Sequence, residues 1–156
     1  MKKIFLMLLP LVIGCVTVPI AEKIVAQRTS ATIAAPKDKI WPLLVAEIAQ
    51  HYPIQVIEKD SGLISTQMVQ MPVGFNNRGM EQYIYPPRGF LATWEGLRMS
   101  MQIIAIDGEP GTTIVTINSH YEAYESNLSK SWVVAQSSGA VENQVLTAIE
   151  QKLNLK

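Results

Sequence analysis

The feature that most constrains the fold is a strict alternation of apolar and polar side chains over 97–103. The sequence Leu-Arg-Met-Ser-Met-Gln-Ile places an apolar residue at every odd position, which is the period of a β-strand buried on one face. A turn sequence, Asp-Gly-Glu-Pro-Gly, follows at 107–111, and a second β-rich segment covers 112–124. We therefore expect a long antiparallel hairpin with Met99 and Met101 in the core.

The segment before this hairpin predicts a strand, a helix and two short strands. A strand is expected over 28–34, and a helix with Ile40, Leu44 and Ile48 on one face is expected to end before Pro53. Because proline lacks an N–H, Pro42 predicts that this helix either begins near Trp41 or is kinked there. Two strands follow, over 54–58 and 63–69, joined by the turn sequence Lys-Asp-Ser-Gly.

The chain closes with a predicted helix over 132–153, whose face carries Val134, Val141, Val145 and Ile149. The Ser-Ser-Gly step at 137–139 either interrupts this helix or delays its start. Hairpin-connected strands favour an antiparallel sheet with helices on one face. The predicted class is α+β, with an antiparallel sheet of about five strands and two helices on one face.

The order of these elements resembles the helix-grip architecture of START-like and TBP-like domains. More narrowly, the stretch from Trp41 to Thr66 is similar to the first part of the domain in BamC/NlpB-type barrel-assembly lipoproteins. The likeness rests on a tryptophan-bearing helix, a strand containing Val56, an Asp-x-Gly turn at 60–62 and a strand that ends in threonine. It departs from the family at Gln67, where an aromatic residue often stands. Likeness of fold alone does not set function.

The first 26 residues predict a signal and a tether. Lys2 and Lys3 precede an uncharged run over 4–14, which is too short to cross a hydrocarbon core of about 30 Å and has the length of a signal-peptide core. It ends in Val-Ile-Gly-Cys, which resembles the bacterial lipobox. The resemblance implies a signal peptide over 1–14, lipidation at Cys15 and a tether over 15–26. A signal with a chance cysteine and an uncleaved anchor are the alternatives.

Lipidation would give the chain a location and a first partner, the membrane. Several acyl chains on one cysteine anchor a protein firmly. Val16 rather than an aspartate follows Cys15, which in lipoproteins of a two-membrane bacterium implies the periplasmic side of the outer membrane. Residues 27–156 would then form a single α+β domain held at that membrane.

Composition excludes several classes of function. The 13 basic and 13 acidic side chains cancel, so no net field gathers nucleic acid. One cysteine excludes zinc and iron–sulfur sites that need two or more thiolates, and with only two histidines we expect no metal and no cofactor. No phosphate loop, dinucleotide fingerprint, HExxH or nucleophile elbow occurs. We therefore predict that the chain is not an enzyme.

The titratable side chains that remain are expected to play structural roles. His51 is predicted to complement the carbonyl groups at the end of the first helix, and His120 to be a surface residue of a strand. Glu122 and Glu125 lie three apart on a β segment, so their side chains are expected on opposite faces and cannot act as an acid/base pair.

The segment 71–96 is the candidate binding region. It is far longer than a usual hairpin connection, and it is rich in aromatic residues that suit either a core cap or a protein contact. Both interpretations stay open. The candidate partner-binding residues are Phe75, Tyr83, Tyr85, Arg88, Phe90 and Trp94.

Two functions are consistent with this sequence. The first is a membrane-anchored, non-catalytic protein-interaction or assembly module of the cell envelope, with an envelope protein as partner. The alternative is a carrier or sensor of an apolar small molecule, held in a groove between the C-terminal helix and the sheet.

Overall fold

The structure, a computed structural model, describes residues 27–73, 79–87 and 91–154. Its elements are, in order, β1 (Ser30–Ile33), α1 (Lys37–His51), β2 (Ile54–Glu58), β3 (Leu63–Thr66), β4 (Val69–Gln70), the 3-10 helix η2 (Met80–Gln82), β5 (Ile84–Tyr85), β6 (Trp94–Asp107), β7 (Thr113–Glu125), β8 (Ser131–Ser137) and α2 (Ala140–Asn154).

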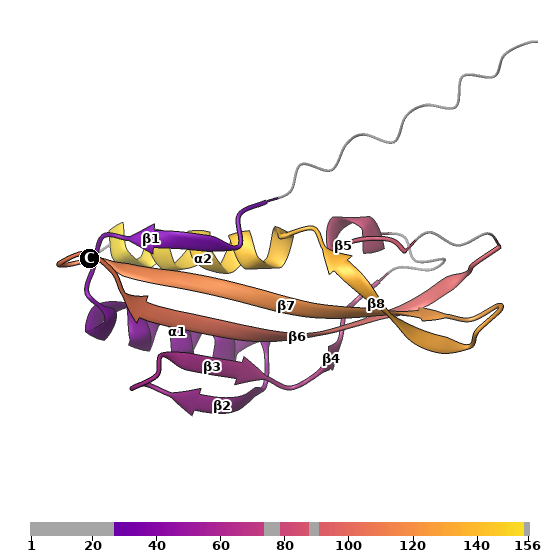
Figure 1. Cartoon of the computed structure of the whole chain (residues 1–156), viewed down its shortest axis with the longest axis horizontal. Helices are drawn as coiled ribbons and strands as arrows, with labels where there is room; N and C mark the ends of the chain where they lie inside the picture. Colours follow the sequence, from indigo (N-terminus) through magenta and orange to yellow (C-terminus); the bar gives the residue numbers. More distant parts are fainter. Residues whose placement is uncertain (1–26, 74–78, 88–90, 155–156) are drawn as a thin grey trace, which may run out of the picture.

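The strands form one antiparallel sheet around the predicted hairpin, which is β6 and β7 (Figure 1). The strand order is β2-β3-β6-β7-β8-β5, with β1 also paired to β7 and β4 also paired to β6. The α+β class is as predicted, but the sheet has eight strands rather than about five. The additional strands are β4, β5 and β8. Because β4 and β5 have two residues each, they show no detectable period.

The prediction of a helix from Trp132 was wrong for its first turns. Residues 131–137 form β8, which pairs with β7 from Tyr121 to Glu125, and α2 begins only at Ala140. Gly139, at a φ of 82°, adopts the left-handed conformation between the two elements. The Ser-Ser-Gly step therefore ends a strand and precedes the helix, because left-handed backbone continues neither structure.

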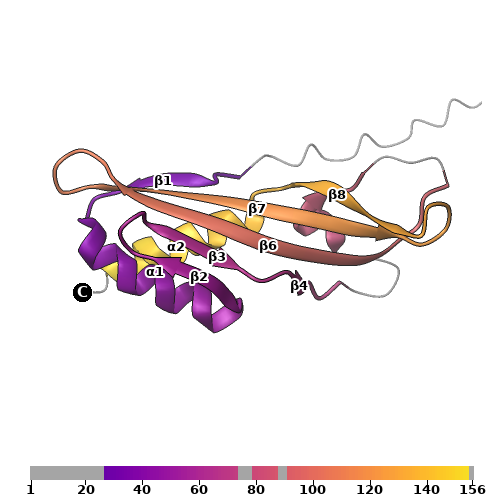
Figure 2. The same ribbon diagram turned by 60° about the horizontal axis from the view of Figure 1, so that its bottom comes forward.

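Both helices lie on the same face of the sheet (Figure 2). The alternating residues of β6 that the sequence assigned to the core lie on this face of the sheet: Leu97, Met99, Met101 and Ile103 are at most 2% exposed. Opposite them, Ile40, Leu44 and Ile48 of α1 and Leu146 and Ile149 of α2 are fully buried. The core is therefore a single layer of side chains between the helix pair and one face of the sheet.

Helix α1 begins at Lys37, earlier than a start near Trp41, and runs through Pro42. The residue before it, Pro36, has extended backbone, and its carbonyl accepts hydrogen bonds from the N–H groups of Lys39 and Ile40. Pro42 is solvent-exposed in the second turn, where its missing N–H removes one hydrogen bond of the helix. Of the two alternatives, the helix therefore continues through Pro42 and does not begin near Trp41.

The β6–β7 hairpin is much longer than the helices that cover it. A helix of 15 residues is about 22 Å long, whereas the 14 residues of β6 extend about 46 Å. The helices therefore lie against one half of the hairpin, and its other half continues past them toward β5 and β8 (Figures 1 and 2).

Candidate functional site: the open face of the sheet

The structure separates the candidate residues of segment 71–96. Tyr83 and Trp94 are half-buried and pack against the core, which lies on the face of the sheet that carries the helices. Tyr85 lies opposite Gln136 of β8. Its neighbour Ile84 is fully buried, so alternation along the strand directs Tyr85 to the face without helices. The remaining candidates, Phe75, Arg88 and Phe90, lie outside the described residues, as does Cys15.

The face without helices carries an aromatic and charged cluster over β5 to β8. Residues opposite each other in antiparallel strands share a face, and Trp132 pairs with Tyr124. Their ring centroids are 5.3 Å apart. The Arg98 guanidinium carbon lies 4.2 Å from the centroid of the Trp132 ring, a cation–π geometry. We call Tyr85, Arg98, Glu122, Tyr124, Trp132 and Val134 the open-face cluster.

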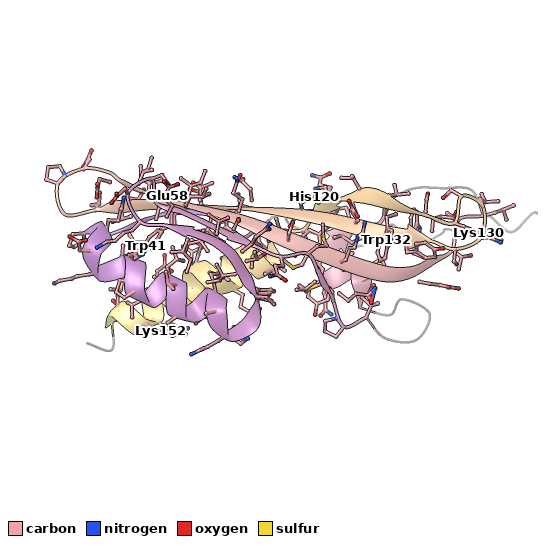
Figure 3. The ribbon with its side chains drawn as sticks, turned by 90° about the horizontal axis from the view of Figure 1, so that it is seen from below. Trp41, Glu58, His120, Lys130, Trp132 and Lys152 are labelled. Atoms are coloured by element: carbon pink, nitrogen blue, oxygen red, sulfur yellow. The ribbon has the colours of Figure 1, made fainter. Side chains whose placement is uncertain are left out.

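Glu122 fixes the position of Arg98. The Arg98 Nε–H donates a hydrogen bond of 2.6 Å to Glu122 Oε2, and the His120 ring Nε2 lies 3.1 Å from the other carboxylate oxygen. These bonds, the one with His120 first, hold the pKa of Glu122 below its ordinary value. His120 is a surface residue of a strand, as predicted, and Figure 3 shows it on the side of the sheet away from Trp41 and Lys152 of the helices.

A glycine makes room for the indole ring. Gly96 lies opposite Tyr124 in the register, and a Cβ at position 96 would lie 3.3 Å from Cη2 of Trp132. The absence of a side chain lets the ring lie close to the β6 backbone, with Arg98 two residues further along the same face. The cluster is thus held by cross-strand contacts rather than by a loop.

The end of the hairpin beyond the cluster is ordered by a buried carboxylate. Glu125, only 4% exposed, accepts hydrogen bonds from the backbone N–H groups of Thr93, Asn127, Leu128 and Ser129. These donors, the Ser129 N–H first, stabilise the charged form, and the pKa of Glu125 falls to about 2. Glu125 and Glu122 point to opposite faces of the sheet, as predicted.

Most of the open-face cluster was missed at the level of sequence. Of its six residues, only Tyr85 was a candidate. The sequence predicted that Glu122 and Tyr124 lie in a strand. It did not predict the strand that pairs with them, because Trp132 and Val134 had been assigned to a helix. A strand assignment for 131–137 would have placed Trp132 and Val134 on one face.

The structure also shows where the other residues and sites considered in the sequence analysis lie. His51 is in the last turn of α1, where its Nε2 lies 3.7 Å from Glu47 Oε1. Fully buried side chains, among them Ile103, Leu146 and Ile149, belong to the core between the helices and the sheet, and a pocket of 240 Å³ lies between the end of α2 and β1. Within the part of the chain that the structure describes, no three His, Cys, Asp or Glu side chains are grouped to hold a metal ion.

Among residues 27–73, 79–87 and 91–154, no helix combines the length and apolarity needed to cross a bilayer. The sequence matches no family model and no curated protein. The resemblance to barrel-assembly lipoproteins therefore stays a prediction from the residues of segment 41–66.

Proposed function

We propose that this protein is a membrane-anchored, non-catalytic interaction module of the bacterial envelope, with the open-face cluster as its contact surface. One observation carries the proposal: the helices cover only the opposite face, while Arg98, Tyr124 and Trp132 are held together on the uncovered one. Arginine, tryptophan and tyrosine dominate the binding energy of protein interfaces. Side chains already fixed by cross-strand contacts lose less conformational entropy when a partner binds.

A lipid on Cys15 would hold this surface at the periplasmic side of the outer membrane. The support is the order of Lys2, Lys3, the apolar run and the Gly-Cys step at its end. Labelling cells with a palmitate analogue tests it. We expect label on the wild-type chain and none on Cys15→Ser, which should also leave the membrane fraction. Equal labelling of both chains would contradict the anchor.

The contact surface is tested by site-specific photo-crosslinking in membranes. A crosslinker at Val134, which is 65% exposed beside Trp132, is expected to capture an envelope protein. Ile106 is the matched control, because it is also exposed on the open face but lies at the other end of β6. Equal capture from both positions would contradict the proposal.

Single substitutions then test which side chains contribute to binding of the captured protein. Trp132→Ala should reduce co-purification of the captured protein by about tenfold or more, the effect of removing an interface hot spot. Tyr85→Ala and Arg88→Ala test whether segment 71–96 contributes. Retention of the partner by all three folded variants would show that the contact lies elsewhere.

The carrier hypothesis has weaker support, because the pocket between the end of α2 and β1 has a volume of only 240 Å³, below the range of about 300–1,000 Å³ of ordinary ligand sites. Solvent extraction and mass spectrometry of the purified chain test it directly. Recovery of a stoichiometric apolar molecule would favour a carrier over the interaction module.

A further inference from the structure

The end of the β6–β7 hairpin that the helices do not cover carries two exposed leucines. We call this end the hairpin tip; it consists of residues 91–93 and 126–130. Leu91 is 65% exposed and Leu128 is 64% exposed. The side chain of Asn127, next to Leu128, donates a 2.9 Å hydrogen bond to the Leu91 carbonyl. The two leucines therefore lie at the same end of the molecule, where Figure 3 shows Lys130 beyond Trp132.

The backbone of the hairpin tip is held in an unfavourable conformation. Leu91 and Lys130, at φ of 62° and 49°, are the two non-glycine residues with positive φ in the described part of the chain. Such backbone is costly for a residue with a Cβ and persists only where surrounding contacts enforce it. The enforcing group is the buried carboxylate of Glu125, which accepts hydrogen bonds from the N–H groups of Leu128 and Ser129. The tip is therefore a fixed structure.

This structure holds its leucines away from the core. Single exposed leucines are common on protein surfaces, whereas backbone strain that fixes two of them outward indicates a function. Apolar side chains on a tip favour contact with an apolar phase. Lys130 forms no ion pair with another described residue, and its long stem lets the ammonium stay in water while neighbouring side chains enter hydrocarbon. The exposed Glu95 offsets its charge, so apolar contact would hold the tip at a bilayer.

The predicted tether is long enough for the tip to reach the membrane that would anchor Cys15. The N–H of Gln27 donates a 3.1 Å hydrogen bond to the carbonyl of Ser138, directly after β8. The seven residues of β8 extend about 23 Å from there to the tip. Residues 15–26 can extend about 40 Å. A lipid on Cys15 and the hairpin tip can therefore contact one bilayer together.

We propose that the hairpin tip inserts Leu91 and Leu128 into the interface of the membrane that anchors the chain, with the Lys130 ammonium at the level of the lipid phosphates. This inference rests on the anchor of the proposed function and adds a second point of attachment. A lipid on a tether leaves the domain free to rotate, whereas a second contact fixes which end of the sheet faces the bilayer.

The test places a fluorescent dye on the tip of the full-length chain purified from membranes. Leu128→Cys provides one free thiol for an environment-sensitive dye, because lipid consumes the sole native cysteine. In vesicles of phosphatidylethanolamine and phosphatidylglycerol, lipids with brominated acyl chains should quench this dye. Glu109→Cys, in the exposed turn at the other end of the hairpin, is the control position and should not be quenched. Equal quenching at both positions, or none at the tip, would overturn the proposal.

A second substitution tests whether the leucines hold the tip in the bilayer. With the dye at position 128, Leu91→Ser should lower the ratio of inserted to free tip by about tenfold. Val134→Ser removes an equally exposed apolar side chain outside the tip and should leave the quenching unchanged. Both variants should fold, because both side chains are exposed. The same quenching in the two variants would also overturn the proposal.

The anchor and the tip contact fail in distinguishable ways. If Cys15 carries no lipid, the purified Leu128→Cys chain takes up dye at two thiols, and both the anchor and the tip contact are wrong. If it takes up one dye that brominated lipids do not quench, the anchor stands and the tip contact is wrong. Crosslinking of the tip to a protein in cells would then assign the leucines to a protein pocket.

Discussion

Glu125 places a carboxylate against the backbone of the loop that joins β7 to β8, and also against the Thr93 N–H before β6. Across this end, the Asn127 side chain donates a 2.9 Å hydrogen bond to the carbonyl of Leu91, whose φ is 62°. A leucine seldom adopts left-handed backbone, which costs about 1–2 kcal/mol. The hydrogen bonds around Glu125 therefore hold a conformation that the local sequence does not favour.

This arrangement predicts an acid-dependent loss of stability. The folded pKa of Glu125 is about 2 and its ordinary value is 4.5, so its stabilisation is complete above pH 4.5 and is lost as the pH falls toward 2. Thermal unfolding should show Glu125→Gln well below wild type at pH 6, with the gap closing by pH 2. Glu109→Gln, at an exposed turn residue, should not change the pH profile. A constant gap for Glu125→Gln would contradict the assignment.

Gly62 offers a second test at the scale of one residue. It has a φ of 73°, and a Cβ there would lie 1.9 Å from the carbonyl oxygen of Ala105. Gly111 has a φ of 82° but open space around it. Chemical denaturation should therefore show a loss of about 1 kcal/mol for Gly111→Ala and about 3 kcal/mol or more for Gly62→Ala. Similar losses would mean that β3 and β6 are not in close contact at this turn.

At the scale of elements, the two helices are joined by an ion pair as well as by the core. Lys152 of α2 donates to Glu47 of α1 at 2.5 Å, and the Glu47 side chain is 9% exposed. A buried carboxylate depends on its partner far more than an exposed one does. This pair therefore couples the end of α2 to the C-terminal part of α1.

Removing the charge of Lys152 alone should lower the free energy of unfolding more than removing the charges of both Lys152 and Glu47. Lys152→Met leaves the Glu47 carboxylate buried with only His51 near it, and we expect a loss of about 1–2 kcal/mol in the free energy of unfolding. The double variant with Glu47→Gln should recover part of that loss. Lys59→Met, which breaks an exposed pair with Asp38, should have no measurable effect. Additive losses in this double-mutant cycle would contradict the coupling.

At the scale of the whole molecule, the sheet has a half that the helices cover and a half that they do not. Ile103 and Ile117, in the covered half, are fully buried. Beyond the helices, most side chains of the open-face cluster are half-buried, and Val134 is exposed. Local opening requires less free energy where less apolar surface is buried.

The protection of backbone amides from hydrogen exchange should therefore differ between the two halves of the hairpin. The amides of Ile103 and Ala105 are expected to exchange only through global unfolding, whereas those of Arg98 and Tyr124 exchange through local opening. Mass spectrometry with peptide resolution, over a range of denaturant concentrations, measures the difference. Uniform protection along β6 would show instead that the whole hairpin opens as one unit.

Local sequence patterns were sufficient to predict the elements that bury one face and expose the other. The alternation over 97–103 predicted β6 and its buried methionines because a strand buried on one face carries that period in its own residues. The turn at 60–62 was likewise visible, because glycine serves a left-handed position. The α+β class followed from the order of these elements.

The sequence by itself determined the central hairpin and the first helix, since each is a pattern of neighbouring residues; the signal over 1–14 stays a prediction of the same kind. Only the tertiary structure decided that 131–137 is a strand, because β-branched residues there fit either a helix face or the free edge of β7. It also decided that Tyr85 and Trp94 lie on opposite faces and that Arg98 meets Trp132. Such contacts join residues far apart in the chain, and their geometry exists only once the strands have paired.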